Sequence, residues 1–259
     1  MPPQKPLRPI PLKASWLDYD TSGMDDCFPN IAEGVYPDPP WSGTTLPDHG
    51  EWSRCSWDVI NCSTDHVVLE RTGELLPYLA HKTVRLSKHD TIEFAYRVEN
   101  HGDAPLHYLW AAHPLITVTG AFELSMPAGP MTFTTFPADG KVYTWPKLGS
   151  INLTREWLPA GRTLKVFIKG LCEGWCILQT ELHRFQFTFD LATIPVLGIW
   201  FNNEGFPSGE ARPFRCIALE PSTSASDSLQ ALARTEYPSI PAGAVAEWSF
   251  QLCISSSPS

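Results

Sequence analysis

Apolar and polar residues alternate with a period of two along several parts of the chain. In residues 91–98, Ile92, Phe94, Tyr96 and Val98 alternate with charged or small residues. This pattern is typical of a β-strand that buries one face and exposes the other. The same alternation occurs in residues 66–70, 164–169, 184–190 and 247–254. Each of these segments is therefore predicted to be a half-buried strand.

Turn residues separate the predicted strands, and helical signals are few. Glycine occurs with proline, asparagine or aspartate in residues 100–103, 127–130, 138–140 and 159–161, as is typical of turns. One short helix is predicted in residues 229–234, with Ser226 or Asp227 as its cap. Many strands with almost no helix favour an all-β sandwich or barrel.

No internal repeat or linker divides the chain, so we expect one domain over residues 1–259. Residues 1–15 and 255–259 are expected to be frayed ends. Apolar residues make up 43% of the sequence and charged residues 18%, which is enough to build a large core. The net charge of −9 disfavours nucleic-acid binding. No apolar run is long enough for a membrane helix, so no membrane partner is predicted.

The chain has seven cysteines and no recognisable secretory signal at its amino terminus. An odd number of cysteines without such a signal favours reduced thiols and a cytoplasmic location. Cys172, Cys176 and His183 could be read as a metal site, but zinc sites use closer pairing and a second ligand pair. We therefore expect no metal.

Three segments place polar residues in settings suited to chemistry. Residues 47–52 contain an Asp48-His49-Gly50 turn. Either this turn presents the imidazole from a loop, or Asp48 only caps its own turn and His49 is a surface residue. Residues 106–115 hold His107 and His113 in an apolar run, and such histidines often serve only as buried hydrogen-bonding groups. His113 precedes a proline, which indicates that the strand ends or lies at a sheet edge there, and its ordinary pKa suits proton transfer.

Glu220 ends an apolar strand and is followed by a proline. Glutamate is rarely buried without a partner. Glu220 therefore either forms a salt bridge or acts as a general base whose proton affinity is changed by partial burial. Neither a phosphate-binding glycine-rich loop nor a serine-nucleophile motif is present. The chemistry of this chain therefore depends on histidine and carboxylate groups.

Taken in order, these segments resemble the aldose 1-epimerase, or galactose mutarotase-like, superfamily. Residues 48–50 are similar to its His-Gly loop and residues 112–115 to its His-Pro segment. Residues 217–221, with Asp227-Ser228 and then residues 240–243, are similar to its carboxyl-terminal signature, and residues 194–203 to the strand before it. The resemblance spans residues 23–254 and implies a large antiparallel β-sandwich with few short helices.

The resemblance also implies an isomerase that interconverts the α and β anomers of a free sugar by opening and closing its ring. Glu220 would be the general base, His113 the general acid, and His49 would bind a sugar hydroxyl. No metal or organic cofactor is needed for this reaction. Further residues expected in the sugar-binding wall are His107, Trp110, Trp200, Asn202 and Asn203.

The sequence departs from the superfamily pattern in ways that concern substrate choice. The chain begins close to the His-Gly loop, so we expect the family's earlier strands to be missing or shortened, and their arginine and asparagine motif is not carried over. The substrate-binding aspartate would fall near Gln179 or Thr180, and Ser226 stands where a proline is common. Two alternatives to an epimerase stay open: a carbohydrate-binding β-sandwich without catalysis, and a structural or interaction domain.

Overall fold

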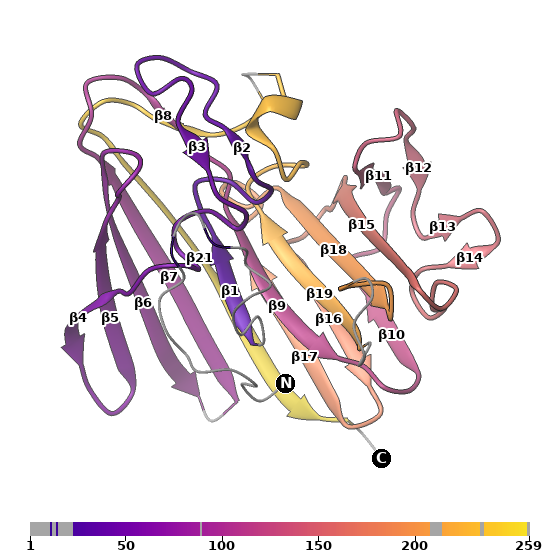
Figure 1. Ribbon diagram of the computed structural model, residues 1–259. Helices are drawn as coiled ribbons and strands as arrows, with labels where there is room; N and C mark the ends of the chain where they lie inside the picture. Colours follow the sequence, from indigo (N-terminus) through magenta and orange to yellow (C-terminus); the bar gives the residue numbers. More distant parts are fainter. Residues whose placement is uncertain are drawn as a thin grey trace.

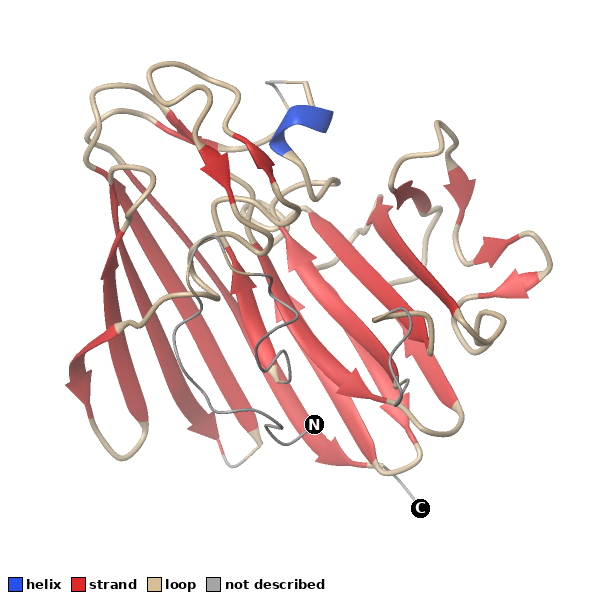
Figure 2. Ribbon diagram, viewed as in Figure 1, coloured by secondary structure: helices blue, strands red, loops and turns tan. Residues whose placement is uncertain are grey.

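The computed structural model describes residues 11, 14, 23–88, 90–207, 214–233 and 236–257. These residues are nearly all in strands and loops, as Figures 1 and 2 show. Two large antiparallel sheets share one hydrophobic core, so the predicted all-β sandwich is confirmed. No helix within the described ranges is long and apolar enough to span a membrane.

The seven-stranded sheet carries the segments with candidate chemistry. All of its strand pairs are antiparallel. Its order is β1 (Met24–Cys27), β9 (Ala111–Thr117), β19 (Arg215–Ser222), β18 (Val196–Asn203), β15 (Arg162–Lys169), β11 (Thr132–Phe136) and β12 (Tyr143–Thr144).

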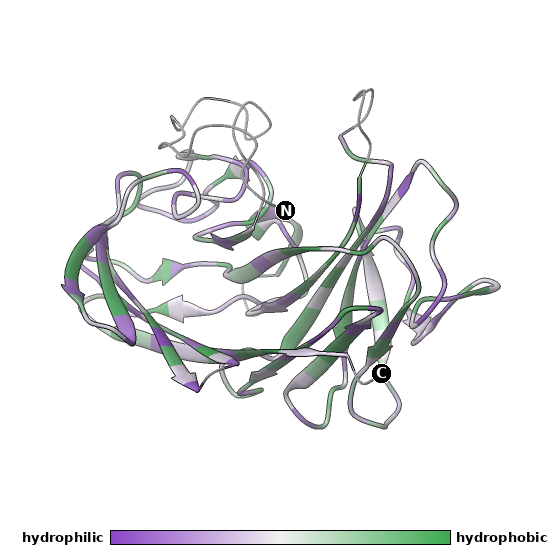
Figure 3. Cartoon of the chain, turned by 90° about the horizontal axis from the view of Figure 1, so that it is seen from below, coloured by the Kyte–Doolittle hydropathy of each residue, from purple (hydrophilic) through white to green (hydrophobic). Residues whose placement is uncertain are grey.

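The eight-stranded sheet covers one face of the first sheet. Apolar positions recur along the strands of both sheets (Figure 3). Its order is β10 (Phe122–Ser125), β16 (Trp175–Thr180), β17 (His183–Phe189), β21 (Val245–Ser256), β7 (Thr91–Asn100), β6 (Tyr78–Lys88), β5 (His66–Thr72) and β4 (Asp58–Cys62).

Three two-stranded ribbons complete the described strands. They pair β2 (Gly34–Val35) with β3 (Thr45–Leu46), β8 (Leu106–His107) with β20 (Ser239–Ile240), and β13 (Lys147–Leu148) with β14 (Ile151–Asn152).

The strands predicted from alternation are all present, as β5, β7, β15, β17 and β21. Two local expectations are wrong. The helix predicted over residues 229–234 is a single 3₁₀ turn, Leu229–Ala231, and its N-cap, Ser228, makes no side-chain capping bond. Strand β21 continues through Ser256 because Ser255 and Ser256 pair with β17. The other residues expected to fray lie almost entirely outside the described ones.

The central strands of the seven-stranded sheet bury both faces, and this encloses the polar residues they carry. β9, β18 and β19 are buried along nearly their whole length. One face joins the core between the sheets. On the other face, Leu115, Cys216 and Ala218 form a second, separate cluster with Trp200 and Phe214. Side chains two or four positions away on the same strands share this face, and they therefore point away from the core.

Candidate functional site

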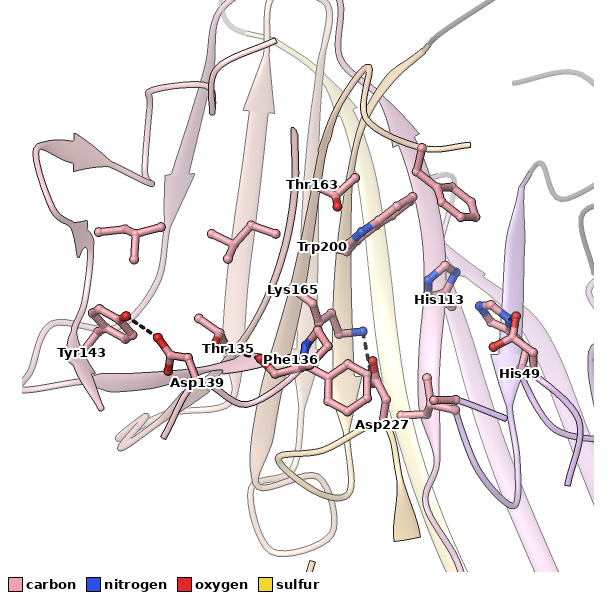
Figure 4. A pocket seen from close by; sticks show the side chains of 17 residues that line it. His49, His113, Thr135, Phe136, Asp139, Tyr143, Thr163, Lys165, Trp200 and Asp227 are labelled. Atoms are coloured by element: carbon pink, nitrogen blue, oxygen red, sulfur yellow. Dashed lines mark hydrogen bonds and ion pairs between the residues drawn. The ribbon is translucent and has the colours of Figure 1, made fainter. Parts of the chain in front are cut away.

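A cavity of about 600 Å³ lies on this second face of the seven-stranded sheet. Strand pairing brings its key residues together, because Glu220 lies opposite Gly198, and Trp200 lies opposite both Ala218 and Lys165. Pairs that face each other across neighbouring strands point to the same side. The cavity is lined by side chains from β9, β15 and β18, by the β11–β12 segment, and by the loops that hold His49 and Asp227 (Figure 4).

A buried ion cluster forms the floor of the cavity. The Lys165 ammonium donates a hydrogen bond to Oε2 of Glu220, and its Nζ lies 3.5 Å from Oδ1 of Asp227. Glu220 has no exposed surface, and Lys165 and Asp227 are each 7% exposed. Gly198 leaves room for this cluster, since a Cβ there would lie 3.2 Å from the Cβ of Glu220 and 3.4 Å from Cε of Lys165.

Both sequence-predicted catalytic residues meet at this cluster. Nε2 of His113 lies 3.7 Å from Oε1 of Glu220, which is longer than a hydrogen bond. Oε1 is buried and accepts no hydrogen bond from any residue in the described ranges. The His113 ring also lies 4.9 Å from the His49 ring and 6.2 Å from Trp200, between ring centroids. His49, His113 and Trp200 thus face one cavity, with Glu220 directly beneath.

The turn at residues 48–50 holds His49 over the cavity. His49 has φ +62° and Gly50 has φ +67°, both in the left-handed region. Only glycine fits at position 50, because a Cβ would lie 2.1 Å from the carbonyl oxygen of Phe28. The His49 amide donates to Ile31 O at 2.6 Å, and Arg54 Nε donates to Asp48 O at 3.0 Å. Nδ1 of His49 lies 3.1 Å from Oδ2 of Asp48.

Burial and charge set the protonation states around the cavity floor. Burial raises the pKa of Glu220 to about 7. The negative charge of Asp227 also raises this pKa, and the two effects together outweigh the lowering effect of the Lys165 ammonium. Burial opposes the charge on Lys165, but Asp227 and Glu220 together raise its pKa to about 12. Lys165 alone faces both carboxylates. Their two negative charges therefore stabilise its charged form more than its single positive charge stabilises either carboxylate. Burial, together with His49 and Lys165, lowers the pKa of His113 well below its ordinary value. His113 is therefore neutral at pH 7.

Four residues predicted for the sugar-binding wall do not line this cavity. His107 is on β8, where its Nδ1 lies 3.0 Å from Oδ2 of Asp38. Asn202 donates to the carbonyl oxygens of Phe206 at 2.8 Å and Phe214 at 3.1 Å, and Asn203 donates to Leu158 O at 2.5 Å. These amides hold loops together. The fourth predicted residue that does not line the cavity is Trp110.

Trp110 is fully buried in the core between the sheets, against Tyr96, Trp248 and Phe250 at ring distances of 5.0, 5.5 and 5.9 Å. We therefore expect Trp110→Ala to lower the free energy of unfolding by about 3–5 kcal/mol, the usual loss for a core tryptophan. Denaturant unfolding measures this. The conservative Trp110→Phe should retain most of this stability, and a Trp110→Ala variant as stable as the wild type would contradict this placement.

The sequence did not predict the pairing of Lys165 with Asp227. Lys165 is on a correctly predicted strand, where nothing in the alternation marks it as buried. Asp227 was expected in a loop of the carboxyl-terminal signature, or with Ser226 as a possible helix cap, and its carboxylate pairs with Lys165. Gln179, near which the family's aspartate would fall, is on β16 in the other sheet and does not line the cavity. Cys172, Cys176 and His183 form no metal-binding group, and no other such group occurs among the described residues.

Comparisons with known proteins place the fold. No protein-family model matches the sequence, and no curated protein matches it. Solved structures do match. An Escherichia coli K12 protein, provisionally assigned as an aldose 1-epimerase, superposes with a TM-score of 0.70 and 17% identity, over 97% of this chain and 89% of its own.

Two further structures agree with this result. A galactose mutarotase-like protein from Lactobacillus casei gives a TM-score of 0.65 at 18% identity, over 90% of this chain and 85% of its own. An aldose epimerase homologue from C. elegans gives 0.64 at 12% identity, over 90% and 82%. Similarity at these identities establishes a shared fold, and it confirms the fold that the sequence resemblance implied.

Proposed function

We propose that this chain, which has the galactose mutarotase-like fold, is an aldose 1-epimerase with Glu220 as general base and His113 as proton donor. The observation that carries the proposal is the meeting of a carboxylate and an imidazole, 3.7 Å apart, at the floor of a cavity of about 600 Å³. Fold similarity alone does not carry it, because one fold can host many functions.

The reaction needs two coupled proton transfers. The base removes the proton from the anomeric hydroxyl as the bond between the anomeric carbon and the ring oxygen breaks, and the acid protonates that ring oxygen. Rotation about the bond next to the new aldehyde, followed by closure with the roles reversed, gives the other anomer. A group whose pKa lies near the working pH is suited to removing and returning a proton. Glu220, with a pKa of about 7, meets this requirement.

The other cavity residues take supporting roles in this proposal. The anomeric hydroxyl donates to Oε1 of Glu220, the oxygen that Lys165 leaves unoccupied. The ring N–H of neutral His113 donates a hydrogen bond to the ring oxygen and passes its proton to it as that oxygen becomes an alkoxide. The imidazolate that this leaves takes the proton back when the ring recloses, and His49 binds a neighbouring hydroxyl. Trp200 supplies an apolar wall for the sugar ring. Lys165 holds the base in place and favours its ionised form.

Polarimetry tests the proposal directly. Freshly dissolved α-D-glucose and α-D-galactose, with other pure anomers in a panel, should reach rotational equilibrium faster in the presence of the purified protein. Boiled protein and buffer at the same pH give the uncatalysed rate. A wild-type protein that is inert on a broad panel of aldoses and sugar phosphates would rule out the epimerase function.

A carbohydrate-binding domain without catalysis is the second candidate, and one observation favours it. Glu220 has no exposed surface and its carboxylate is already paired with Lys165. In a binding-only protein this pair would serve to shape the cavity floor. Titration calorimetry distinguishes the two functions, because such a protein binds sugars without speeding their equilibration, and Glu220→Gln binds them nearly as well.

A further inference from the structure

The cavity extends well beyond the groups that would carry out the reaction. The sheet order from His113 to Tyr143 is β9, β19, β18, β15, β11 and β12. With neighbouring strands about 4.8 Å apart, this path covers about 24 Å. The part of this path that runs from β9, with His113, to β15, with Lys165, is only about 14 Å long. Two further strands, β11 and β12, thus line the cavity without contributing to the catalytic cluster.

The additional part of the cavity begins directly beside the lysine. Phe136 on β11 is the strand partner of Lys165, and both line the cavity. Beyond Phe136, the Tyr143 hydroxyl donates a hydrogen bond of 2.5 Å to the Asp139 carboxylate. Figure 4 shows Tyr143 and Asp139 on the opposite side of Lys165 from His113 and His49. We call the part formed by Thr135, Phe136, Asp139 and Tyr143 the arm subsite.

We propose that the arm subsite binds a second sugar ring, so that the substrate is a neutral reducing disaccharide or longer oligosaccharide. This inference rests on the proposed epimerase function. Only the reducing-end ring has a free anomeric carbon, and that carbon must lie at Glu220 and His113. The remaining rings must then extend away from the catalytic cluster. The arm subsite is the part of the same cavity that lies in that direction.

The side chains of the arm subsite suit a carbohydrate ring. Phe136 and Tyr143 offer aromatic surface, and the Tyr143 ring is itself fixed by stacking on Phe133 at 5.1 Å between centroids. Asp139 is exposed, and the hydrogen bond from Tyr143 lowers its pKa, so it accepts hydrogen bonds as a carboxylate. Apolar and aromatic walls with a few placed polar groups are typical of ligand sites.

The charges around the cavity favour a neutral sugar over a phosphorylated one. Lys165 is the only lysine or arginine among the described lining residues, and its charge is taken up by Glu220 and Asp227. Asp48 and Asp139 add negative charge at the cavity wall. A phosphate group would meet net repulsion here, since phosphate sites are built from arginine, lysine and backbone N–H groups.

Steady-state rates on matched sugars test the inference. We expect kcat/KM for the disaccharides lactose and maltose to exceed the values for galactose and glucose. Asp139→Ala and Tyr143→Ala should each lower kcat/KM for the disaccharides about tenfold, as for loss of a hydrogen bond to a charged group, and leave the monosaccharide values unchanged. Val142→Ala is the control, because Val142 is in the same loop but 69% exposed and outside the cavity lining.

Other outcomes separate the two proposals. Monosaccharide rates equal to or above the disaccharide rates, or an equal loss on both classes in the variants, would overturn the arm subsite and leave the epimerase function standing. If the protein turns over no sugar, the epimerase function fails, and calorimetry with the same four sugars decides the subsite. Tighter binding of lactose or maltose that Asp139→Ala abolishes would support it, and equal or absent binding would refute it.

Discussion

Glu220→Gln should slow anomer interconversion by about 10²–10⁴, the usual contribution of a positioned general base. The amide has nearly the same size and shape as the carboxylate, so it fills the same space beneath His113. It cannot take a proton from the anomeric hydroxyl, because a neutral amide is not a base at this pH. Polarimetry with a pure anomer measures the loss, and thermal unfolding shows whether the variant remains folded.

A matched control comes from the other sheet. Glu70 on β5 forms an ion pair with Nε2 of His81 on β6 at 2.9 Å, which is the same chemistry outside the cavity. Glu70→Gln should therefore keep the full rate. If Glu220→Gln is folded and retains most of the wild-type rate, Glu220 is not the base. Asp227, which lines the cavity itself, would then be the carboxylate to replace next.

The sequence predicted the strands well because burial in this fold follows the strand period. β7 and β21 each bury one face against the core, and the alternation in residues 91–98 and 247–254 records this directly. The segments with candidate chemistry behave differently, since β9, β18 and β19 bury both faces. Their near-continuous apolar runs still indicated strands, and the histidine and glutamate within those runs stood out.

Residues whose partners come from irregular segments could not be predicted. Asn202 shares a strand face with Trp200, as the period of two requires, but its amide is occupied by the loop carbonyl oxygens of Phe206 and Phe214. Such loops have no periodic pattern, so the sequence gives no sign of where they fold back. The same holds for Asp227, which lies in a loop and reaches Lys165 across the cavity floor.

Lys165 was missed for a different reason. Within residues 164–169 it alternates with apolar residues just as Lys169 does, and an alternating lysine normally indicates a solvated face. In the structure Lys169 is exposed, whereas Lys165 is buried against two carboxylates. Only the sheet order, which places β15 two strands from β19, shows that Lys165 has partners.

The pH dependence of catalysis should reveal what Lys165 does. The base must be ionised to act, so kcat/KM rises with pH through the pKa of Glu220, near 7 in the wild type. Lys165 lowers this pKa and Asp227 raises it. We therefore expect Lys165→Met to move the rise to higher pH by about one to three pH units, the effect of losing a neighbouring opposite charge. Asp227→Asn should move the rise to lower pH.

Other titratable groups also surround Glu220 in the structure. His113 faces it from β9, Cys216 lies on the same strand as Glu220, and Cys27 lies on β1. Burial, with Glu220 nearby, raises the pKa of both thiols, so they are neutral at pH 7. His49 faces it from the loop above, with Asp48 beside that histidine. Lys165 also lowers the pKa of His113, so Lys165→Met raises that pKa as well. The two substitutions still move the pKa of Glu220 in opposite directions, because they remove opposite charges.

The sign of the shift separates a role in the reaction from a purely structural one. Lys165→Met leaves two buried carboxyl groups without their cation, and removing one partner of a buried ion pair typically costs about 3–5 kcal/mol. Glu220 can avoid most of that penalty by taking up a proton, which keeps the variant folded but inactive at pH 7. Raising the pH should then restore activity, as it would not for a variant that is merely damaged.

Two further variants complete the test. Lys165→Arg keeps the positive charge, so the rise in kcat/KM should stay near its wild-type pH. Lys82 forms a partly buried ion pair with Asp26 outside the cavity, and Lys82→Met should cost stability without moving the pH dependence. If Lys165→Met and Asp227→Asn lower the rate equally at every pH, the lysine is only structural. If they move the pH dependence in opposite directions, the proton affinity of the base is set by a residue that sequence patterns alone assign to the surface.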